Sequence, residues 1–208
     1  HQGIVLEPAG RSTAPAAAVA AQLAIERAGP EAVLLIMPSD HHIDDPRAFL
    51  NAVEAGYEAA KAGLFVTFGV KPSKPETGFG YVKTGASAGF DKVFQVDRFV
   101  EKPDKESAKR FCAEPGYFWN AGIFLFGAKA YLDELTKFEP DMVRCCLDAV
   151  KNATTDFDFI RLVPLRGVAA AAGGAAREVV AEIVGRHRHA GRAAVDHAAD
   201  GRAMALAE

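Results

Sequence analysis

Two continuous apolar runs place the strongest constraint on what this chain can fold into. The first is AVLLIMPSD, residues 32–40, and the second is LFVTFGV, residues 64–70. Neither run alternates apolar with polar residues, which is typical of strands covered by helices on both faces. Between them DDPRAF has the acids and the proline of a helix start, and apolar residues follow at helical spacing at Phe49, Leu50, Val53, Tyr57 and Ala60. Strand, helix and strand with short connections predict a βαβ unit, so we expect an α/β fold in which residues 32–40 form a central parallel strand.

Further elements follow along the first 166 residues. GIVLEP predicts a strand and APAAAVAAQLAIERAG a helix, because the latter is rich in Ala and Leu and closes on glycine. KVFQVDRFVE predicts a strand and DKESAKRFCAE a short helix with Asp104 as its N-cap. YFWNAGIFLF is an aromatic-rich run broken by Asn120 and Gly122, and two more helices are expected before Asn152.

Two segments differ from the rest of the chain in amino-acid composition. Residues 71–89, KPSKPETGFGYVKTGASAG, are rich in proline and glycine and predict repeated turns and a binding loop. Beyond Arg166 there is no aromatic residue, lysine or proline, and Ala and Gly alternate with Arg, His and Asp. Such a segment buries little apolar surface, so we predict a domain over 1–166 and an atypical tail over 167–208, out of frame or disordered, with one helix at 175–184.

Charge and cysteine usage exclude several classes of partner. The net charge is −3, which offers no broad basic face to a nucleic acid or to an acidic membrane. The cysteines, Cys112, Cys145 and Cys146, form no CxxC pair, and their odd number fits a reducing cytosol. No apolar stretch reaches the ~18 residues of a membrane span. We therefore expect a cytoplasmic protein that binds neither nucleic acid nor membrane.

Polar residues follow the apolar runs, at the strand ends where ligands bind in open α/β sheets. Asp40 can hold Mg²⁺, which takes one or two carboxylates together with water and phosphate oxygens, or it can cap a turn. His41 and His42 are neighbours that point in different directions, which argues against a zinc site.

The stretch FVEKPD ends another predicted strand with Glu101 and Lys102. A residue before proline is held extended, so we expect Pro103 to present Lys102 at a fixed place. The ammonium can neutralise phosphate oxygens and the carboxylate can accept hydrogen bonds from sugar hydroxyls, although a solvated surface ion pair is the alternative. Gly78 and Gly80 in ETGFGY let the backbone approach a ligand, or form a hairpin.

Taken in order, EPAGRSTAPA, MPSDHHI, TFGVKPSKPETGFGYV, RFVEKPD and YFWNAGIFLF resemble the mannose-1-phosphate guanylyltransferase family, in the bacterial form that also occurs fused to a phosphomannose isomerase. The resemblance runs from about Gly3 to Arg161. It implies a Rossmann-like, GT-A-like nucleotidyltransferase fold with a mostly parallel sheet flanked by helices. It also implies transfer of GMP from GTP to mannose 1-phosphate with Mg²⁺, which gives GDP-mannose and pyrophosphate.

The same resemblance implies a role for individual residues. Asp40 would bind the metal and Lys102 the sugar phosphate, as the two catalytic residues, while Glu101 would hold sugar hydroxyls. Ser12 stands where the family usually has Asn, and Phe79 where it usually has Tyr. The other residues expected to bind substrate are Gly10, Arg11, Ser12 and Thr13 for guanine, and Gly78, Gly80, Asn120 and Gly122 for mannose.

The sequence departs from the family in two places. The family's glycine-rich phosphate loop, of the type GGxGxRLWPLS, does not occur in it, nor does the GWSDVGSW motif with a second metal ligand. We therefore expect an N-terminally truncated domain that is inactive by itself. Two alternatives are another sugar 1-phosphate nucleotidyltransferase, for example for glucose 1-phosphate with UTP or dTTP, and a non-catalytic module that binds a sugar phosphate. A homo-oligomer is also left open.

Overall fold

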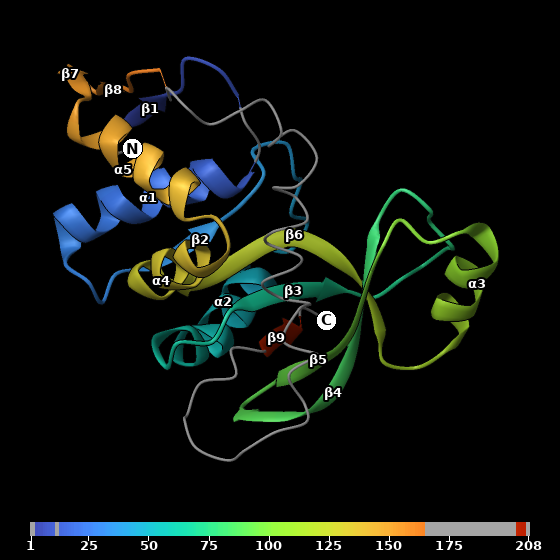
Figure 1. Ribbon diagram of the computed structural model, residues 1–208. Coiled ribbons are helices and arrows are strands. Elements are labelled where there is room, and N and C mark those ends of the chain that lie inside the picture. The colour runs from blue at the N-terminus through green and yellow to red at the C-terminus, as the bar shows by residue number, and fades with distance from the viewer. Residues whose placement is uncertain (1–2, 11–12, 165–202, 207–208) are drawn as a thin grey trace. The chain divides into compact units, whose positions relative to one another are not determined.

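The computed structural model describes residues 3–10, 13–164 and 203–206 (Figure 1). By its contacts the chain divides into two compact units. Unit 1 is formed by His1–Ala32 and Ala128–Ile183, and unit 2 by Val33–Gly127 and Val184–Glu208. Unit 2 therefore contains all of the residues that the sequence proposes for the sugar and the metal. The domain predicted over 1–166 stays a prediction.

Unit 1 combines three helices with a small sheet. Helix α1 (Thr13–Ala28) packs against α4 (Ala128–Phe138) and α5 (Pro140–Lys151). Alanines fill the buried face of α1, and their small side chains allow the helices to approach closely. These helices confirm the three predicted from the sequence. The strands, in their order across the sheet, are β1 (Ile4–Leu6), β8 (Phe159–Arg161) and β7 (Thr154–Asp156).

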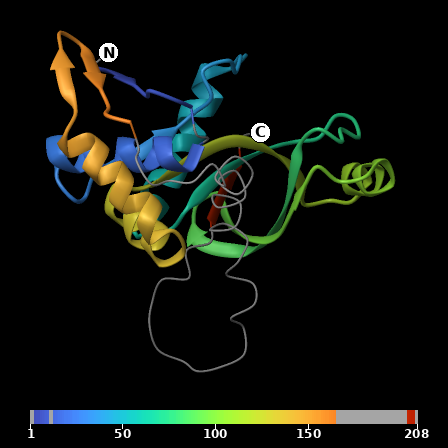
Figure 2. The ribbon, with the colours of Figure 1, turned by 45° about the horizontal axis from the view of Figure 1, so that its top comes forward.

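Unit 2 is built on a six-stranded sheet and two helices. Helices α2 (Pro46–Lys61) and α3 (Lys105–Ala113) lie at opposite ends of the unit, with the long strands running between them (Figures 1 and 2). The strands, in their order across the sheet, are β2 (Val33–Ile36), β6 (Tyr117–Gly127), β3 (Val66–Val70), β9 (Ala203–Leu206), β5 (Val93–Glu101) and β4 (Gly80–Phe90). β4 also pairs with the first part of β6.

The α/β class is confirmed, but the expectation of a mostly parallel sheet is wrong. Of the eight pairings in the described part of the chain, only β1–β8 and β3–β9 are parallel. β2 and β3 do run the same way, as the βαβ prediction requires, because both are antiparallel to β6. Since β6 lies between them, β2 is an edge strand of the described sheet and not a central one. The periodicity of a run predicts a strand but does not reveal which later strand inserts beside it.

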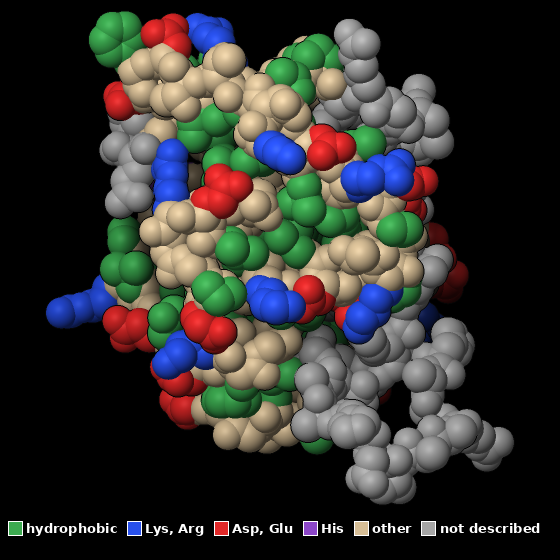
Figure 3. Space-filling model, turned by 60° about the vertical axis from the view of Figure 1, so that its left-hand side comes forward, with side chains coloured by type: hydrophobic (Ala, Val, Ile, Leu, Met, Phe, Trp, Pro, Cys, Tyr) green, Lys and Arg blue, Asp and Glu red, His purple; other side chains and the backbone are tan. Residues whose placement is uncertain are grey.

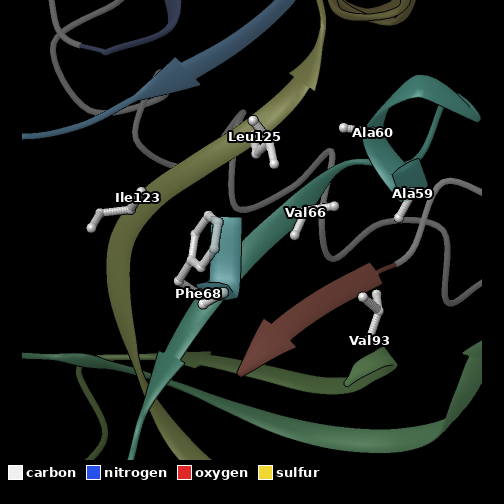
Figure 4. Close-up of a cluster of buried hydrophobic side chains, with 8 residues drawn as sticks. Ala59, Ala60, Val66, Phe68, Val93, Ile123 and Leu125 are labelled. Atoms are coloured by element: carbon white, nitrogen blue, oxygen red, sulfur yellow. The ribbon is translucent and has the colours of Figure 1, made fainter. Parts of the chain in front are cut away.

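Helix α2 covers the main hydrophobic core of unit 2. The helix is amphipathic as predicted, yet Leu50 and Tyr57 are exposed. Its buried face is made by Ala52, Ala59 and Ala60, small residues that allow α2 to lie close to the sheet. Figure 4 shows how side chains from α2, β3, β5 and β6 meet in this core: Ala59, Ala60, Val66, Phe68, Val93, Ile123 and Leu125.

Aspartates fix the starts of both helices in unit 2. Asp45 accepts hydrogen bonds from the backbone N–H groups of Arg47 and Ala48, at 3.0 Å each, before the first turn of α2. Asp104 accepts from the N–H of Ser107 at 2.7 Å, and this bond lowers the pKa of Asp104. The N-cap predicted at Asp104 is therefore confirmed, and α3 begins directly after the FVEKPD stretch.

Two segments that the sequence marks as irregular contain strands. The sequence predicts turns over 71–89, but only 71–79 forms a loop and β4 starts at Gly80. Pairing with β5 along β4 outweighs the low strand propensity of its glycines. In the tail 167–208 the structure describes only β9, which lies between β3 and β5. The helix predicted at 175–184 lies outside the described residues.

Candidate functional site

One edge of β6 is interrupted in the middle. On this edge β2 pairs with residues 124–127 and β4 pairs with residues 117–119, while β3 occupies the opposite edge. Within the described part of the chain, residues 120–123 thus have no strand partner on the edge that β2 and β4 share. The end of β2 and the start of β4 face each other across this gap in the pairing, which we call the β6 interruption. In open α/β sheets, ligands bind beside the carboxyl ends of strands, and the carboxyl end of β2 lies at this interruption.

Gly80 lies at the interruption, close to Glu101 and Asn120. It is the first residue of β4, and the register pairs it with Glu101 at the end of β5. A Cβ atom at Gly80 would lie 2.7 Å from Glu101 Oε2 and 3.5 Å from the Cβ of Asn120. A side chain at position 80 would therefore collide with the Glu101 carboxylate, and glycine lets the start of β4 lie directly beside two residues whose side chains can hydrogen-bond sugar hydroxyls. The structure brings together three of the residues that the sequence selects for the sugar.

Gly122 lies on the side of the interruption that faces β2. A Cβ there would lie 4.0 Å from Cγ of Pro38, which follows β2. Gly122 has a φ of +68°, a conformation that glycine adopts without strain. It belongs to a β-bulge, because the register pairs residue 67 with residue 124 but residue 69 with residue 120. Bulges redirect side chains and are frequent beside active sites.

Lys102 follows β5 in a strained conformation. The expectation that Pro103 holds it extended is wrong, because the φ of Lys102 is +45°, on the left-handed side that L-residues rarely adopt. Its N–H donates to the carbonyl of Phe79 at 3.2 Å, which continues the pairing of β4 with β5, and Pro103 is buried. These contacts hold the residue in place. The turn thus fixes the backbone of Lys102, and the side chain that extends from it is exposed.

The loop 71–79 is held by a buried tyrosine. The hydroxyl of Tyr81 accepts from the N–H of Glu76 at 2.9 Å. The Glu76 carboxylate lies 3.5 Å from Nζ of Lys74 and accepts from the N–H of Gly78 at 3.4 Å. A Cβ at Gly78 would meet only Glu76, at 3.8 Å, so no contact in the described part of the chain places Gly78 beside Glu101 as it does Gly80.

Asp40 lies in an exposed turn two residues after Pro38. A single exposed carboxylate near the interruption fits Mg²⁺, which completes its shell with water and substrate phosphates. Among the described residues, no three His, Cys, Asp or Glu side chains are grouped so that they could hold a metal. The neighbouring His42 lies 3.1 Å from Asp44, so these exposed groups form an ion pair when the histidine is protonated.

The residues expected to bind guanine belong to unit 1. Gly10 is exposed, with open space where a Cβ would stand, and Thr13 is the first residue of α1. Arg11 and Ser12 lie outside the described residues.

The first turn of α1 is anchored from the other helices of unit 1. Tyr131 donates its hydroxyl to the carbonyl of Ala14 at 3.0 Å, and the thiol of Cys146 lies 3.8 Å from the carbonyl of Pro15 as donor. Burial raises the pKa of Tyr131 far above its usual value and that of Cys146 to about 11, so both groups are neutral and keep the protons that these bonds need.

Near the interruption, Thr67 and Trp119 are not selected from the sequence, and Phe79 is noted there only as a departure from the family's usual tyrosine. Thr67 is fully buried, and its hydroxyl donates to Oδ1 of Asn120 at 2.7 Å. Phe79 packs edge-on against Trp119 with ring centroids 5.3 Å apart, and Phe79 is exposed. Nε1 of Trp119 is buried and has no hydrogen-bond partner in the part of the chain that the structure describes. The one available signal is the polar Thr67 within the apolar run LFVTFGV.

The surface shows no dominant sign of charge where it can be seen. On the face in Figure 3, Lys and Arg side chains lie interspersed with Asp and Glu, without a broad patch of either. Of the helices described, none has the length and apolar character needed to cross a membrane.

Comparison with known proteins gives consistent matches. Residues 1–163 match the family described as nucleotidyl transferase. The xanthan biosynthesis protein XanB of Xanthomonas campestris pv. campestris (strain B100) is 50% identical over 159 residues, which cover 76% of this chain and 33% of that protein. The mannose-1-phosphate guanylyltransferase of Escherichia coli (strain K12) is 46% identical over 166 residues, 77% of this chain and 34% of the relative. The crystal structure of mannose-6-phosphate isomerase from Helicobacter pylori is similar with a TM-score of 0.65 at 34% identity, over 77% of this chain and 60% of that one. The chain thus spans about a third of the length of these curated relatives.

Proposed function

Because this chain belongs to the nucleotidyl transferase family, we propose that it binds mannose 1-phosphate and takes part in GMP transfer from GTP, which forms GDP-mannose and pyrophosphate. The observation that carries this proposal is the close approach of Glu101 and Asn120 to the backbone of Gly80, which has no side chain. A carboxylate and a carboxamide around a backbone without a side chain are suited to a small polyhydroxylated ligand. Similarity to proteins with mannose-phosphate names supports the choice of sugar.

In this proposal, some residues of the chain bind the sugar ring and others bind the phosphate group. Glu101 accepts hydrogen bonds from sugar hydroxyls, and Gly80 and Gly122 keep the backbone clear of the ring. The ammonium of Lys102 neutralises charge on the phosphate. The backbone N–H of Lys102 donates to the carbonyl of Phe79, which fixes the backbone that bears this side chain. Gly10, Arg11, Ser12 and Thr13 line the guanine pocket in this proposal.

The reaction is an in-line displacement at phosphorus. A phosphate oxygen of mannose 1-phosphate forms a bond to the α-phosphorus of GTP, and the bond from that phosphorus to the oxygen bridging to the β-phosphate breaks. Pyrophosphate leaves with this electron pair. No protein nucleophile is needed, so positioning and charge neutralisation are the contributions of the protein.

A divalent cation would supply further positive charge at the phosphates. Asp40 is the residue of this chain that we propose to hold it, as Mg²⁺, with water and phosphate oxygens as the other ligands. Its exposed position after β2 leaves room for these ligands. With GTP as co-substrate we place the protein in the cytoplasm, without nucleic-acid or membrane partners.

Titration calorimetry of the 208-residue chain with mannose 1-phosphate and Mg²⁺ tests the proposal. We expect binding that Lys102→Ala weakens by about tenfold or more, since a charge-assisted hydrogen bond contributes about 1.5–3 kcal/mol. Lys92→Ala is the matched control, because Lys92 is an exposed lysine with a φ of +55° in the turn between β4 and β5. Absence of binding, or equal loss in both variants, would refute the proposed ligand site. Binding of glucose 1-phosphate in its place would indicate the alternative sugar.

A further inference from the structure

Thr67 is a polar residue in a fully buried position. It lies in β3, between the apolar residues of the unit 2 core, and its accessible surface is 0%. A buried hydroxyl needs a partner, and its partner here is the side chain of Asn120, with Oγ1 2.7 Å from Oδ1. The carbonyl of Ile123 lies further away, at 3.3 Å. A valine would fill the same volume, so packing alone does not require threonine here.

A second donor fixes the orientation of the Asn120 carboxamide. The N–H of Gly122 lies 3.3 Å from the same Oδ1 atom. A backbone N–H can only donate, so the atom that it faces must be the carboxamide oxygen and not the nitrogen. The hydroxyl of Thr67 and the N–H of Gly122 thus both donate to Oδ1. The amide nitrogen, Nδ2, has no partner within the described part of the chain.

The bulge in β6 makes this arrangement possible. Its extra residues let Gly122, with φ of +68°, turn back so that its N–H reaches the side chain two positions earlier. The Cβ of Asn120 and Oε2 of Glu101 both lie close to Gly80, at 3.5 Å and 2.7 Å from where a Cβ of that residue would stand. Asn120 therefore offers an N–H donor, and Glu101 a carboxylate acceptor, from two residues that both lie next to the first residue of β4. A hydroxyl group can satisfy both, because its hydrogen is donated to one and its oxygen accepts from the other.

We infer that Thr67 is a positioning residue, which fixes the Asn120 carboxamide with its nitrogen toward the sugar, so that Asn120 recognises a hydroxyl oxygen as a donor. The inference deepens the proposed function and rests on it for the identity of the ligand. Thr67 does not touch the sugar itself. Its effect on binding is transmitted through one hydrogen bond to a residue that does.

The experiment compares Thr67→Val with Thr67→Ser in the ¹⁵N-labelled full chain. Valine keeps the volume and removes the donor, whereas serine keeps the donor. In the free protein, the side-chain NH₂ resonances of Asn120 should shift and broaden in Thr67→Val but stay in place in Thr67→Ser. Calorimetry with mannose 1-phosphate and Mg²⁺ should show affinity lower by about tenfold in Thr67→Val and recovered in Thr67→Ser, as expected for one lost hydrogen bond.

Two further variants complete the test. Thr84→Val removes another strand hydroxyl, one that donates to the carbonyl of Gly116 at 3.3 Å, and should change neither readout. Asn120→Asp keeps the oxygen that Thr67 and Gly122 bind but replaces the outward donor with an acceptor. The affinity of Asn120→Asp for mannose 1-phosphate should be lower by at least about tenfold. This variant therefore tests the inference even if Thr67→Val does not fold.

The outcomes separate the inference from the proposed function. Unchanged Asn120 resonances in Thr67→Val, or binding by Asn120→Asp equal to that of the wild-type chain, would overturn the role of Thr67. If the wild-type chain binds no mannose 1-phosphate, the proposed ligand is wrong, and the NH₂ resonances of the free protein still decide whether Thr67 orients Asn120.

Discussion

Replacing Gly80 by alanine should weaken sugar binding strongly while leaving the fold intact. The added methyl group would lie 2.7 Å from Oε2 of Glu101 and 3.2 Å from Cζ of Phe99, both closer than an ordinary contact of about 3.5 Å. Gly80 is not among the glycines with positive φ, so the backbone accepts alanine without strain. The end of the Glu101 side chain is flexible and exposed, and it can move away. We therefore expect the free energy of unfolding to change by no more than about 1 kcal/mol.

The same displacement has a large effect on the ligand. When Glu101 moves aside, its hydrogen bond to a sugar hydroxyl is lost, and hydrogen bonds to charged groups contribute about 1.5–3 kcal/mol. This corresponds to an affinity for mannose 1-phosphate that is lower by about 10- to 150-fold.

Calorimetry with mannose 1-phosphate and denaturant unfolding measure the two effects on the same samples. Gly85→Ala is the matched control, because it lies further along β4 and its Cβ would meet Asp97 and Gln95 at 3.4 Å, ordinary contact distances. It should leave affinity and stability unchanged. If Gly80→Ala binds mannose 1-phosphate as tightly as the wild-type chain, Glu101 does not hold the sugar and the site must be sought elsewhere.

Three further changes test other parts of the structure. Lys102→Gly should raise the free energy of unfolding by about 1 kcal/mol relative to Lys102→Ala, because glycine adopts a φ of +45° without strain. Both variants should bind mannose 1-phosphate weakly in calorimetry. Equal stability of the two variants would contradict the backbone strain at this position. Burial raises the pKa of Cys146 from 9.0 to about 11, so between these pH values the folded chain keeps a proton that the unfolded chain releases. The stabilisation should be fully present below pH 9.0 and should be lost as the pH rises toward 11. Denaturant unfolding under reducing conditions should show a smaller loss of stability over this range in Cys146→Ala. Ala205→Pro should lower the free energy of unfolding by about 2 kcal/mol or more, because it removes a backbone N–H donor in β9, which lies between β3 and β5. Ala207→Pro, just after the last residue of β9, is the control. Equal unfolding curves for the two variants would show that β9 adds nothing to the stability of the sheet.

Local patterns predict most elements of this fold. Continuous apolar runs mark β2 and β3, and Asp104 marks the start of α3, because these features depend on residues close in sequence. The order of strands depends on contacts between distant segments, so the position of β6 between β2 and β3 does not follow from either run. The strand β9 has no apolar alternation that would have predicted it, since its place is set by the pairing groups of β3 and β5.

The candidate site is predictable in its residue types more than in its geometry. Glu101, Gly80 and Asn120 are recognisable because their chemistry suits a sugar, and the structure places them together. The conformation of Lys102 is not predictable from the proline that follows, because a hydrogen bond to Phe79 from another strand overrides the local preference for extended backbone. Thr67 acts through another side chain, and no pattern in the sequence links positions 67 and 120.

Departures from local rules are concentrated at the β6 interruption, and this concentration is independent of any similarity to known proteins. In the described part of the chain, three residues other than glycine have positive φ: Lys92, Lys102 and Phe157. Lys92 and Phe157 lie in the turns of the β4–β5 and β7–β8 hairpins, where positive φ is the usual geometry. Lys102 is not in a hairpin turn, and its strain has no such explanation. The bulge at Gly122, the buried hydroxyl of Thr67 and the buried Nε1 of Trp119 lie along the same strand or beside it. Because each feature lowers stability unless something compensates, their clustering supports the proposal that this segment is shaped for a ligand and not for folding alone.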